Sequence, residues 1–292
     1  MARDVRSTPP WWFRVGARVR AFASGLGLLG ILVAVVGASG WLPPVAIDVL
    51  GLGGFALIVV GIGSTFFPGA PALPPRRVRS PVRGRWSAAN SPATRLPSHG
   101  THGNGQTYAV DLVYEPEDGA RPKFGHGPGF RPPEDFPAFG QEVRAPADGR
   151  VVAFRDSARD HRSRSNIPAM AYMMATGMVR EFAGSRFLLG NHVVLDLGDG
   201  TFAALAHLRH RSVTVRPGQS VRRGDVVGHC GNTGNSSEPH LHFQLMDRPW
   251  ALIAAGLPFV FTDVRIEGSG DSVGIPRDGE IMVAPDEDRS RP

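Results

Sequence analysis

The sequence predicts a mainly β domain preceded by a pair of membrane-spanning helices, and two observations lead to this fold class. The amino-terminal region contains two long apolar runs, at residues 21–42 and at about 45–67. From about Val82 onward, short apolar or alternating runs are separated by Gly, Pro, Asn and Asp. Many short runs of this kind are typical of β-strands joined by turns, so this region is expected to be all-β.

The two apolar runs predict a transmembrane helical hairpin over residues 21–67. Residues 21–42 carry no charge and are long enough to cross a bilayer, and the second run is interrupted only by Asp48. Pro43 and Pro44 stand between the runs and would break a continuous helix. One uncleaved anchor followed by an interfacial segment is the alternative. A cleavable signal peptide is disfavoured, because a second long apolar run follows the first.

Composition suggests the other boundaries. A stretch rich in Pro and Arg follows the hairpin and is expected to be a linker. A Met-rich, helix-like stretch interrupts the β region and is expected to be an insertion, while the end of the chain is polar. The predicted division is a basic segment 1–20, the hairpin 21–67, a linker 68–81, a β domain 82–267 with the insertion at about 156–186, and a polar tail 268–292.

Charge and cysteine content narrow the function. The net charge of +6 suits an anionic partner such as lipid head groups or wall polymers. No zinc-finger, RNA-binding signature or basic helix indicates nucleic acid. Cys230 is the single cysteine, which excludes an internal disulfide and a cysteine-based metal site. A metal would therefore need histidine and carboxylate ligands.

The histidines that point to chemistry lie in two strand-like runs. His240 and His242 flank a leucine, so in a strand their side chains project from the same face. On its own, such a pair is more often two surface histidines than a site. His207 lies in a second apolar strand, and Asp111 lies inside a third. A carboxylate in an apolar strand is costly unless it is paired or bound to a metal.

Two more histidines, His99 and His102, precede Asp111 by twelve and nine residues. A set of two histidines and one aspartate leaves zinc a fourth position open for water, which is the arrangement of a catalytic site. Residue chemistry alone leaves open which of the two histidines would join Asp111.

Three ordered segments carry a family resemblance: FGQEVRAPADGRVVAF at 139–154, GNHVVLDLGDGTFAALAHL at 190–208, and VRPGQSVRRGDVVGHCGNTGNSSEPHLHFQ at 215–244. The region from Val82 to Phe261 resembles the lysostaphin-like peptidoglycan endopeptidases. The resemblance implies a small antiparallel β-sheet or sandwich domain, Zn²⁺ as cofactor, and metalloendopeptidase activity on bacterial cell-wall peptidoglycan.

The same resemblance implies roles for individual residues. Asp111 and His242 correspond to zinc ligands, and His207 and His240 to catalytic histidines that do not bind the metal. The first ligand departs from the family's usual spacing of three residues before the aspartate; a subgroup with a longer spacing favours His99, and His102 stays the alternative. A further position that the pattern matches, Asn191, is expected to orient the site or contact the substrate.

The expected function is hydrolysis of peptide cross-links in peptidoglycan by a membrane-anchored enzyme. The expected partners are stem peptides or cross-bridges, membrane lipid and a regulatory protein. The alternative is a non-catalytic wall-binding or regulatory module that activates another hydrolase, but inactive versions usually lose site residues, and here every position holds a suitable one. A membrane scaffold is a weaker third interpretation.

The expected location conflicts with the distribution of arginines. A wall hydrolase needs its catalytic domain outside the cell membrane. Five arginines precede the hairpin and five follow it within residues 76–85. The positive-inside rule would place both flanks in the cytoplasm. The functional argument is given the greater weight, so an extracytoplasmic domain is expected.

Overall fold

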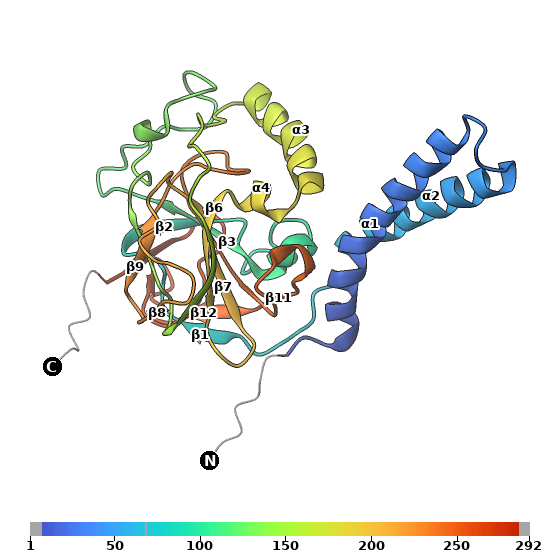
Figure 1. The fold of residues 1–292 in the computed structure, drawn as a ribbon. Coiled ribbons are helices and arrows are strands. Elements are labelled where there is room, and N and C mark those ends of the chain that lie inside the picture. The colour runs from blue at the N-terminus through green and yellow to red at the C-terminus, as the bar shows by residue number, and fades with distance from the viewer. Residues whose placement is uncertain (1–7, 68, 286–292) are drawn as a thin grey trace, which may run out of the picture.

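The computed structural model describes residues 8–67 and 69–285. Most of the chain forms a β domain, and a hairpin of two long helices projects from one side of it (Figure 1). The first helix begins beside the β domain and the second returns to it, so the hairpin is attached at its base (Figure 1). The predicted mainly β, antiparallel fold with an apolar helical region before it is confirmed.

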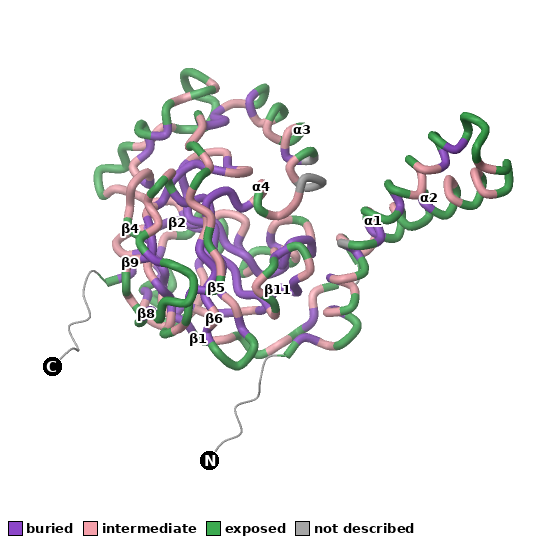
Figure 2. Tube along the Cα trace, in the orientation of Figure 1, coloured by how far each residue is buried: buried purple, intermediate pink, exposed green. Residues whose placement is uncertain are grey.

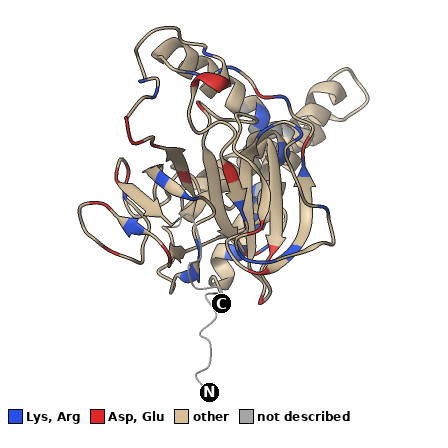
Figure 3. Ribbon diagram, turned by 90° about the vertical axis from the view of Figure 1, so that its left-hand side faces the viewer, with Lys and Arg blue, Asp and Glu red and all other residues tan. Residues whose placement is uncertain are grey.

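The hairpin consists of α1 (Trp11–Gly37) and α2 (Pro44–Phe66). Both helices are long and apolar enough to cross a membrane, as judged by length and composition. Pro43 is the N-cap of α2 and Pro44 lies in its first turn, where a proline costs no intrahelical hydrogen bond. The large apolar side chains on the outside of the hairpin are mostly exposed (Figure 2). Figure 3 shows charged residues over the β domain, whereas the part of the hairpin visible beyond it is almost entirely tan.

Helix α1 begins ten residues before the apolar run, because its first turns lie against the β domain. Phe13 and Ala17 are buried there with Ala255. The Arg18 guanidinium forms an ion pair with Asp247 at 3.5 Å. These basic first turns therefore belong to the base of the hairpin, beside the β domain.

Glycines bring the two helices into close contact. A Cβ atom on Gly54 would lie 2.6 Å from the carbonyl oxygen of Gly27, and one on Gly61 would collide with Ser24 Oγ. Small residues at such crossings let helix backbones approach closely, which is how apolar helices associate in lipid.

One large sheet forms the centre of the β domain. Among the described residues it has ten strands, and its paired neighbours run antiparallel. In spatial order they are β13 (Arg265–Ile266), β14 (Ile281–Ala284), β2 (Gly84–Ala89), β3 (Val110–Tyr114), β10 (Leu241–Met246), β7 (Phe202–Leu208), β6 (Asn191–Asp196), β5 (Gly149–Arg155) and β8 (Ser220–Val221), with β11 (Gly256–Leu257) paired to β10.

Two short pairs flank this sheet. β4 (Glu142–Arg144) pairs with β9 (Val226–His229), and β1 (Arg76–Val78) pairs in parallel with β12 (Phe259–Phe261). Part of the expected linker 68–81 is thus a strand, and part of the expected tail joins the large sheet as β14. Both segments carry apolar residues that the core covers: Val78 and Met282 are buried. The division into domains stays a prediction.

Short helices complete the domain. α3 (Ile167–Ala183) and α4 (Ser185–Leu189) lie between β5 and β6, within and just beyond the stretch expected as an insertion. Three 3₁₀ turns are η1 (Gly103–Tyr108), η2 (Pro133–Asp135) and η3 (Ala251–Ile253). Figure 1 shows α3 at the edge of the β domain, on the side from which the hairpin projects.

A buried core fixes the central strands. Trp86 and Met282 are fully buried with Phe243, whose ring lies edge-on to Phe259 at 4.9 Å between centroids. Because side chains alternate along a strand, the opposite face of β10 presents His242. The packing of one face of β10 therefore determines the direction of its polar side chains on the other.

The glycine contact in the hairpin is testable with two adjacent positions. Gly54→Ala places a Cβ against the Gly27 carbonyl, so we expect α1 and α2 to separate. Gly53→Ala has open space around its Cβ and gains helix propensity, about 1 kcal/mol in favour of the helix. Nitroxide labels at Leu29→Cys and Leu57→Cys in the full chain, held in detergent micelles, report the distance between the helices by pulsed electron paramagnetic resonance. Equal distances in the two alanine variants would contradict the packing described.

Candidate metal centre

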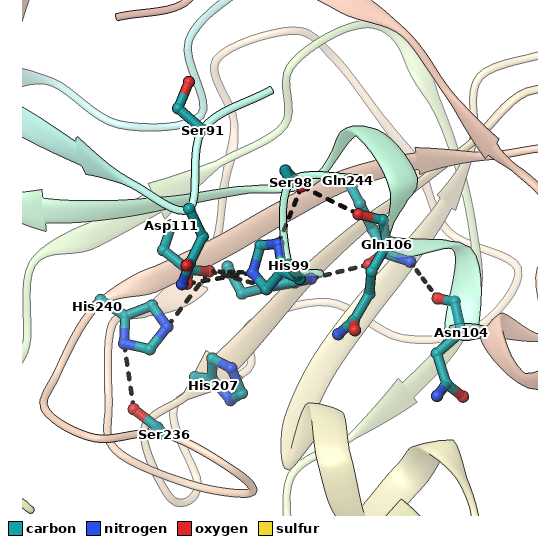
Figure 4. A network of polar contacts seen from close by, with 12 residues as sticks. Ser91, Ser98, His99, Asn104, Gln106, Asp111, His207, Ser236, His240 and Gln244 are labelled. Atoms are coloured by element: carbon teal, nitrogen blue, oxygen red, sulfur yellow. Dashed lines mark hydrogen bonds and ion pairs between the residues drawn. The ribbon is translucent and has the colours of Figure 1, made fainter. Parts of the chain in front are cut away.

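The register of the large sheet places Asp111 beside His242. These two residues are paired across the antiparallel strands β3 and β10. His99 reaches them from the segment before β3, which we call the His99 loop (residues 98–107). One ligand atom from each of the three side chains lies within 4.8 Å of the others. Figure 4 shows His99 pointing toward Asp111, as does His240 from the other side.

The distances within this cluster indicate a place for a cation. His242 Nδ1 lies 2.8 Å from Asp111 Oδ1, and His99 Nε2 lies 3.2 Å from both carboxylate oxygens. The two imidazole rings stand edge to face, with centroids 4.9 Å apart. Two imidazole nitrogens and a carboxylate are a donor set suited to zinc.

The hydrogen bonds behind the cluster determine which ring nitrogens face inward with a lone pair. His242 Nε2–H donates to Gln244 Oε1 at 2.8 Å, and Gln244 Nε2 donates to the Asn104 carbonyl at 2.9 Å. His99 Nδ1–H donates to Ser98 Oγ at 3.0 Å. In the neutral rings the inward nitrogens are then acceptors that face an anionic carboxylate, and a metal ion or a proton between them would satisfy this arrangement. Partners of this kind typically orient metal-bound histidines.

Sequence reasoning missed three of these supporting residues. Gln244 follows His242 by two positions, so the alternation along β10 places it on the same face and was the available signal. Ser98 is adjacent to His99 in the chain. Asn90, whose Nδ2 donates to Asp111 Oδ2 at 2.8 Å, stands 21 residues before the aspartate, and no local pattern points to it.

The two expected catalytic histidines lie beside the cluster. His240 Nε2 lies 3.5 Å from Asp111 Oδ1, and its Nδ1–H donates to the Glu238 carbonyl at 2.7 Å. His207 Nδ1–H donates to the Thr233 carbonyl at 2.8 Å, and its ring centroid lies 4.8 Å from that of His240. Among the described residues, neither Nε2 atom forms a hydrogen bond with the backbone.

His207 adopts a backbone conformation that is rare for a residue with a side chain. Its φ angle is +62°, although it belongs to β7. The neighbouring strand β6 shifts register at the same level, between Asn191 and His192. Left-handed residues other than glycine cost free energy and are concentrated at functional sites. The sheet therefore maintains a strained position where it presents this imidazole.

Burial and mutual charge separate the protonation states of these groups. Burial would raise the pKa of Asp111, but His99 and His240 hold that pKa well below its usual value. Burial lowers the pKa of His207 well below its usual value, and the neighbouring histidines lower it further. Burial would lower the pKa of His240, but the Asp111 carboxylate raises it. Asp111 is thus an anion, and His207 a neutral imidazole.

The remaining two expected residues have other surroundings. His102 is buried outside the three-residue cluster, with its Nδ1 3.0 Å from Thr107 Oγ1 and its ring edge-on to Phe13. Asn191 is also fully buried. Its side-chain amide accepts from the Ala158 N–H and donates to the Ala158 carbonyl, each at 2.8 Å. The amide thus holds the segment before α3 in place, and a substrate contact by Asn191 stays a prediction.

The part of the chain that contains three of these histidines matches a known family. Residues 164–252 match the model described as Peptidase family M23. The chain contains a peptidase family M23 domain. The matched residues include His207, His240 and His242, whereas His99 and Asp111 lie before them. It is the pairing of β3 with β10 that brings the aspartate to the matched region.

Two relatives are similar to this M23 domain over part of their length, and one of them is named for its action on peptidoglycan. Peptidoglycan DD-endopeptidase ShyA of Vibrio cholerae is 38% identical over 71 residues, which are 24% of this chain and 16% of ShyA. Lysostaphin of Staphylococcus simulans is 33% identical over 110 residues, 37% of this chain and 22% of lysostaphin. The chain thus spans less than a quarter of the length of either relative.

Solved structures show only a distant likeness. The catalytic domain of lysostaphin from Staphylococcus simulans aligns with 60% of this chain and 88% of its own, at 20% identity and a TM-score of 0.32. A similarity of this size says nothing about activity. The M23 assignment therefore depends on the sequence match.

The role of Asn191 as a support for the segment before α3 is testable. We expect Asn191→Ala to lower the free energy of unfolding by about 1–3 kcal/mol, because the Ala158 N–H loses its buried acceptor and the Ala158 carbonyl keeps only the His210 imidazole as donor. The Ala158 amide should also exchange with solvent faster. Gln219→Ala removes an exposed amide that bonds to one backbone N–H, and should change the stability by less than about 0.5 kcal/mol. An Ala158 amide that stays protected in Asn191→Ala would contradict this role.

Proposed function

We propose that this protein is a zinc-dependent endopeptidase that hydrolyses peptide cross-links in bacterial peptidoglycan. The observation that carries the proposal is the cluster of His99, Asp111 and His242, with His207 and His240 beside it. The M23 family match and the name of the relative ShyA support the reaction class and the polymer.

The three clustered residues would hold the metal. Their donor atoms are two imidazole nitrogens and one carboxylate oxygen, and the pKa of the aspartate keeps it ionised. The chemistry that zinc supplies in a three-ligand site is Lewis-acid activation of a water molecule and polarisation of a carbonyl at the open fourth position. His99 is the first ligand in this proposal, since His102 bonds to Thr107 instead.

The other two histidines would handle protons and charge. The neutral His207 can accept a proton from the attacking water through Nε2, while its Nδ1–H stays bonded to the Thr233 carbonyl. His240, whose Nε2 lies nearest to Asp111, can donate a hydrogen bond to the oxygen on which negative charge develops. The backbone carbonyls of Thr233 and Glu238 keep both rings oriented, so neither ring must reorganise during the reaction.

The hairpin would anchor the enzyme in the cell membrane. Its outer surface is apolar, and its base carries the arginines of the first turns of α1. The start of α1, the end of α2 and the β domain all lie at the same end of the hairpin, opposite the turn that joins the two helices (Figure 1). In this proposal that end is extracytoplasmic, where peptidoglycan lies.

The metal and the reaction are tested on one sample, the full chain purified in detergent micelles. We expect about one zinc ion per chain and conversion of cross-linked to uncross-linked muropeptides in purified peptidoglycan. His242→Ala should abolish hydrolysis and weaken zinc binding by more than about 100-fold. Loss of a residue that only supports a ligand weakens binding by up to about 100-fold, and loss of a ligand should cost more. Elemental analysis and chromatography of the digested wall provide the two measurements.

His126→Ala is the matched control, because His126 is an exposed histidine of the loop after β3. It should bind zinc and cut peptidoglycan like the unaltered chain. Zinc binding without hydrolysis would contradict the endopeptidase and favour the non-catalytic module. A chain without zinc that still cuts the wall would contradict the metal centre.

A further inference from the structure

The His99 loop supports both candidate histidine ligands. Ser98 Oγ accepts from His99 Nδ1 and donates to the Gln106 carbonyl at 3.0 Å. The Asn104 carbonyl accepts from Gln244, which in turn accepts from His242. A displacement of this loop would therefore move one ligand directly and release the support of the other.

The loop has an unusual backbone and lies close against strand β10. Asn104 and Gly105 both have left-handed φ angles, +53° and +72°. A Cβ atom on Gly105 would lie 3.1 Å from Gln244 Nε2 and from Met246, so the loop lies tightly on β10. Within the loop, the Ser98 N–H donates to the Thr107 carbonyl at 3.0 Å and closes the segment.

The base of the hairpin contacts this loop at His102. The His102 N–H donates to the carbonyl of Thr65, in the last turn of α2, at 2.8 Å. The Arg20 guanidinium of α1 donates to the His102 carbonyl. The Phe13 ring of α1 meets the His102 imidazole edge to face, with centroids 5.4 Å apart and an interplanar angle of 87°. Both helices of the hairpin thus contact the same buried residue.

These contacts are internal to the protein and are not exposed. Phe13 is 2% exposed, His102 1% and Arg20 8%. The His102 imidazole also contacts the far end of the loop, because its Nδ1 is hydrogen-bonded to Thr107 Oγ1. The contacts thus connect the hairpin with His102, His102 with the rest of the loop, and the loop with both candidate ligands, His99 and His242.

We propose that the hairpin is a positioning element of the metal centre, in which Phe13 and Arg20 hold the His99 loop in its metal-binding conformation. This rests on the proposed zinc centre. The hairpin then does more than anchor the protein: a shift of α1 against the β domain changes the metal site. Phe13 and Arg20 act through the loop and do not touch the metal.

The test measures metal binding by the full chain in detergent micelles, independently of hydrolysis. We expect Phe13→Ala and Arg20→Met to weaken Zn²⁺ affinity by about 10–100-fold, as loss of supporting contacts does in metal sites. Competition with a chromophoric chelator gives the affinity, and the visible spectrum of bound Co²⁺ reports the ligand geometry. Arg20→Lys retains a donor for the His102 carbonyl and should restore part of the affinity.

Phe22→Ala is the matched control, since Phe22 is a phenylalanine of the same helix that is 62% exposed. It should leave the affinity within about twofold, as surface substitutions do. Wild-type affinity and an unchanged Co²⁺ spectrum in both Phe13→Ala and Arg20→Met would overturn the proposal. If Phe13→Ala fails to fold, the comparison of Arg20→Met with Arg20→Lys decides, and equal affinities overturn it. An unaltered chain that takes up no zinc would instead overturn the proposed function, and this inference with it.

Discussion

The pairing of Asp111 with His242 across β3 and β10 is the constraint on which the site depends. An ionised carboxylate at the centre of a sheet is costly, and here its partners are imidazoles from three directions together with the Asn90 amide. The apolar face of the same strands packs in the core through Phe243 and Leu112, which fixes the register. A slip of one residue would exchange the two faces, and would bury the histidines in the core.

Around this pair, rigidity comes from backbone carbonyls rather than from other charged groups. The carbonyls of Thr233 and Glu238 orient His207 and His240, and that of Asn104 acts through Gln244. Backbone acceptors held by a sheet and its loops move little, so the imidazoles are preorganised. The cost appears as the left-handed conformation of His207. The backbone is thus strained at the point where the sheet presents this imidazole.

Much of this arrangement could be predicted from the sequence, and the rest depends on contacts between distant segments. Alternation along HLHFQL identified the histidine pair, and an aspartate within an apolar strand identified the carboxylate. The choice of His99 over His102 rested on resemblance, and the fold places the two rings in different surroundings: one beside Asp111, the other against Phe13. No local sequence pattern predicts the strand at residues 76–78 or the packing of α1 on the β domain. Each depends on a partner far away in the chain.

The most direct test of the account is zinc-edge X-ray absorption spectroscopy on the full chain in micelles. The account predicts two imidazole ligands at about 2.0–2.1 Å, with oxygen completing a four-coordinate site. His99→Ala should lower the number of imidazoles to one, while His207→Ala should leave it at two. Three or four imidazoles around the metal would contradict the account, because His207 or His240 would then be ligands rather than the residues that handle protons.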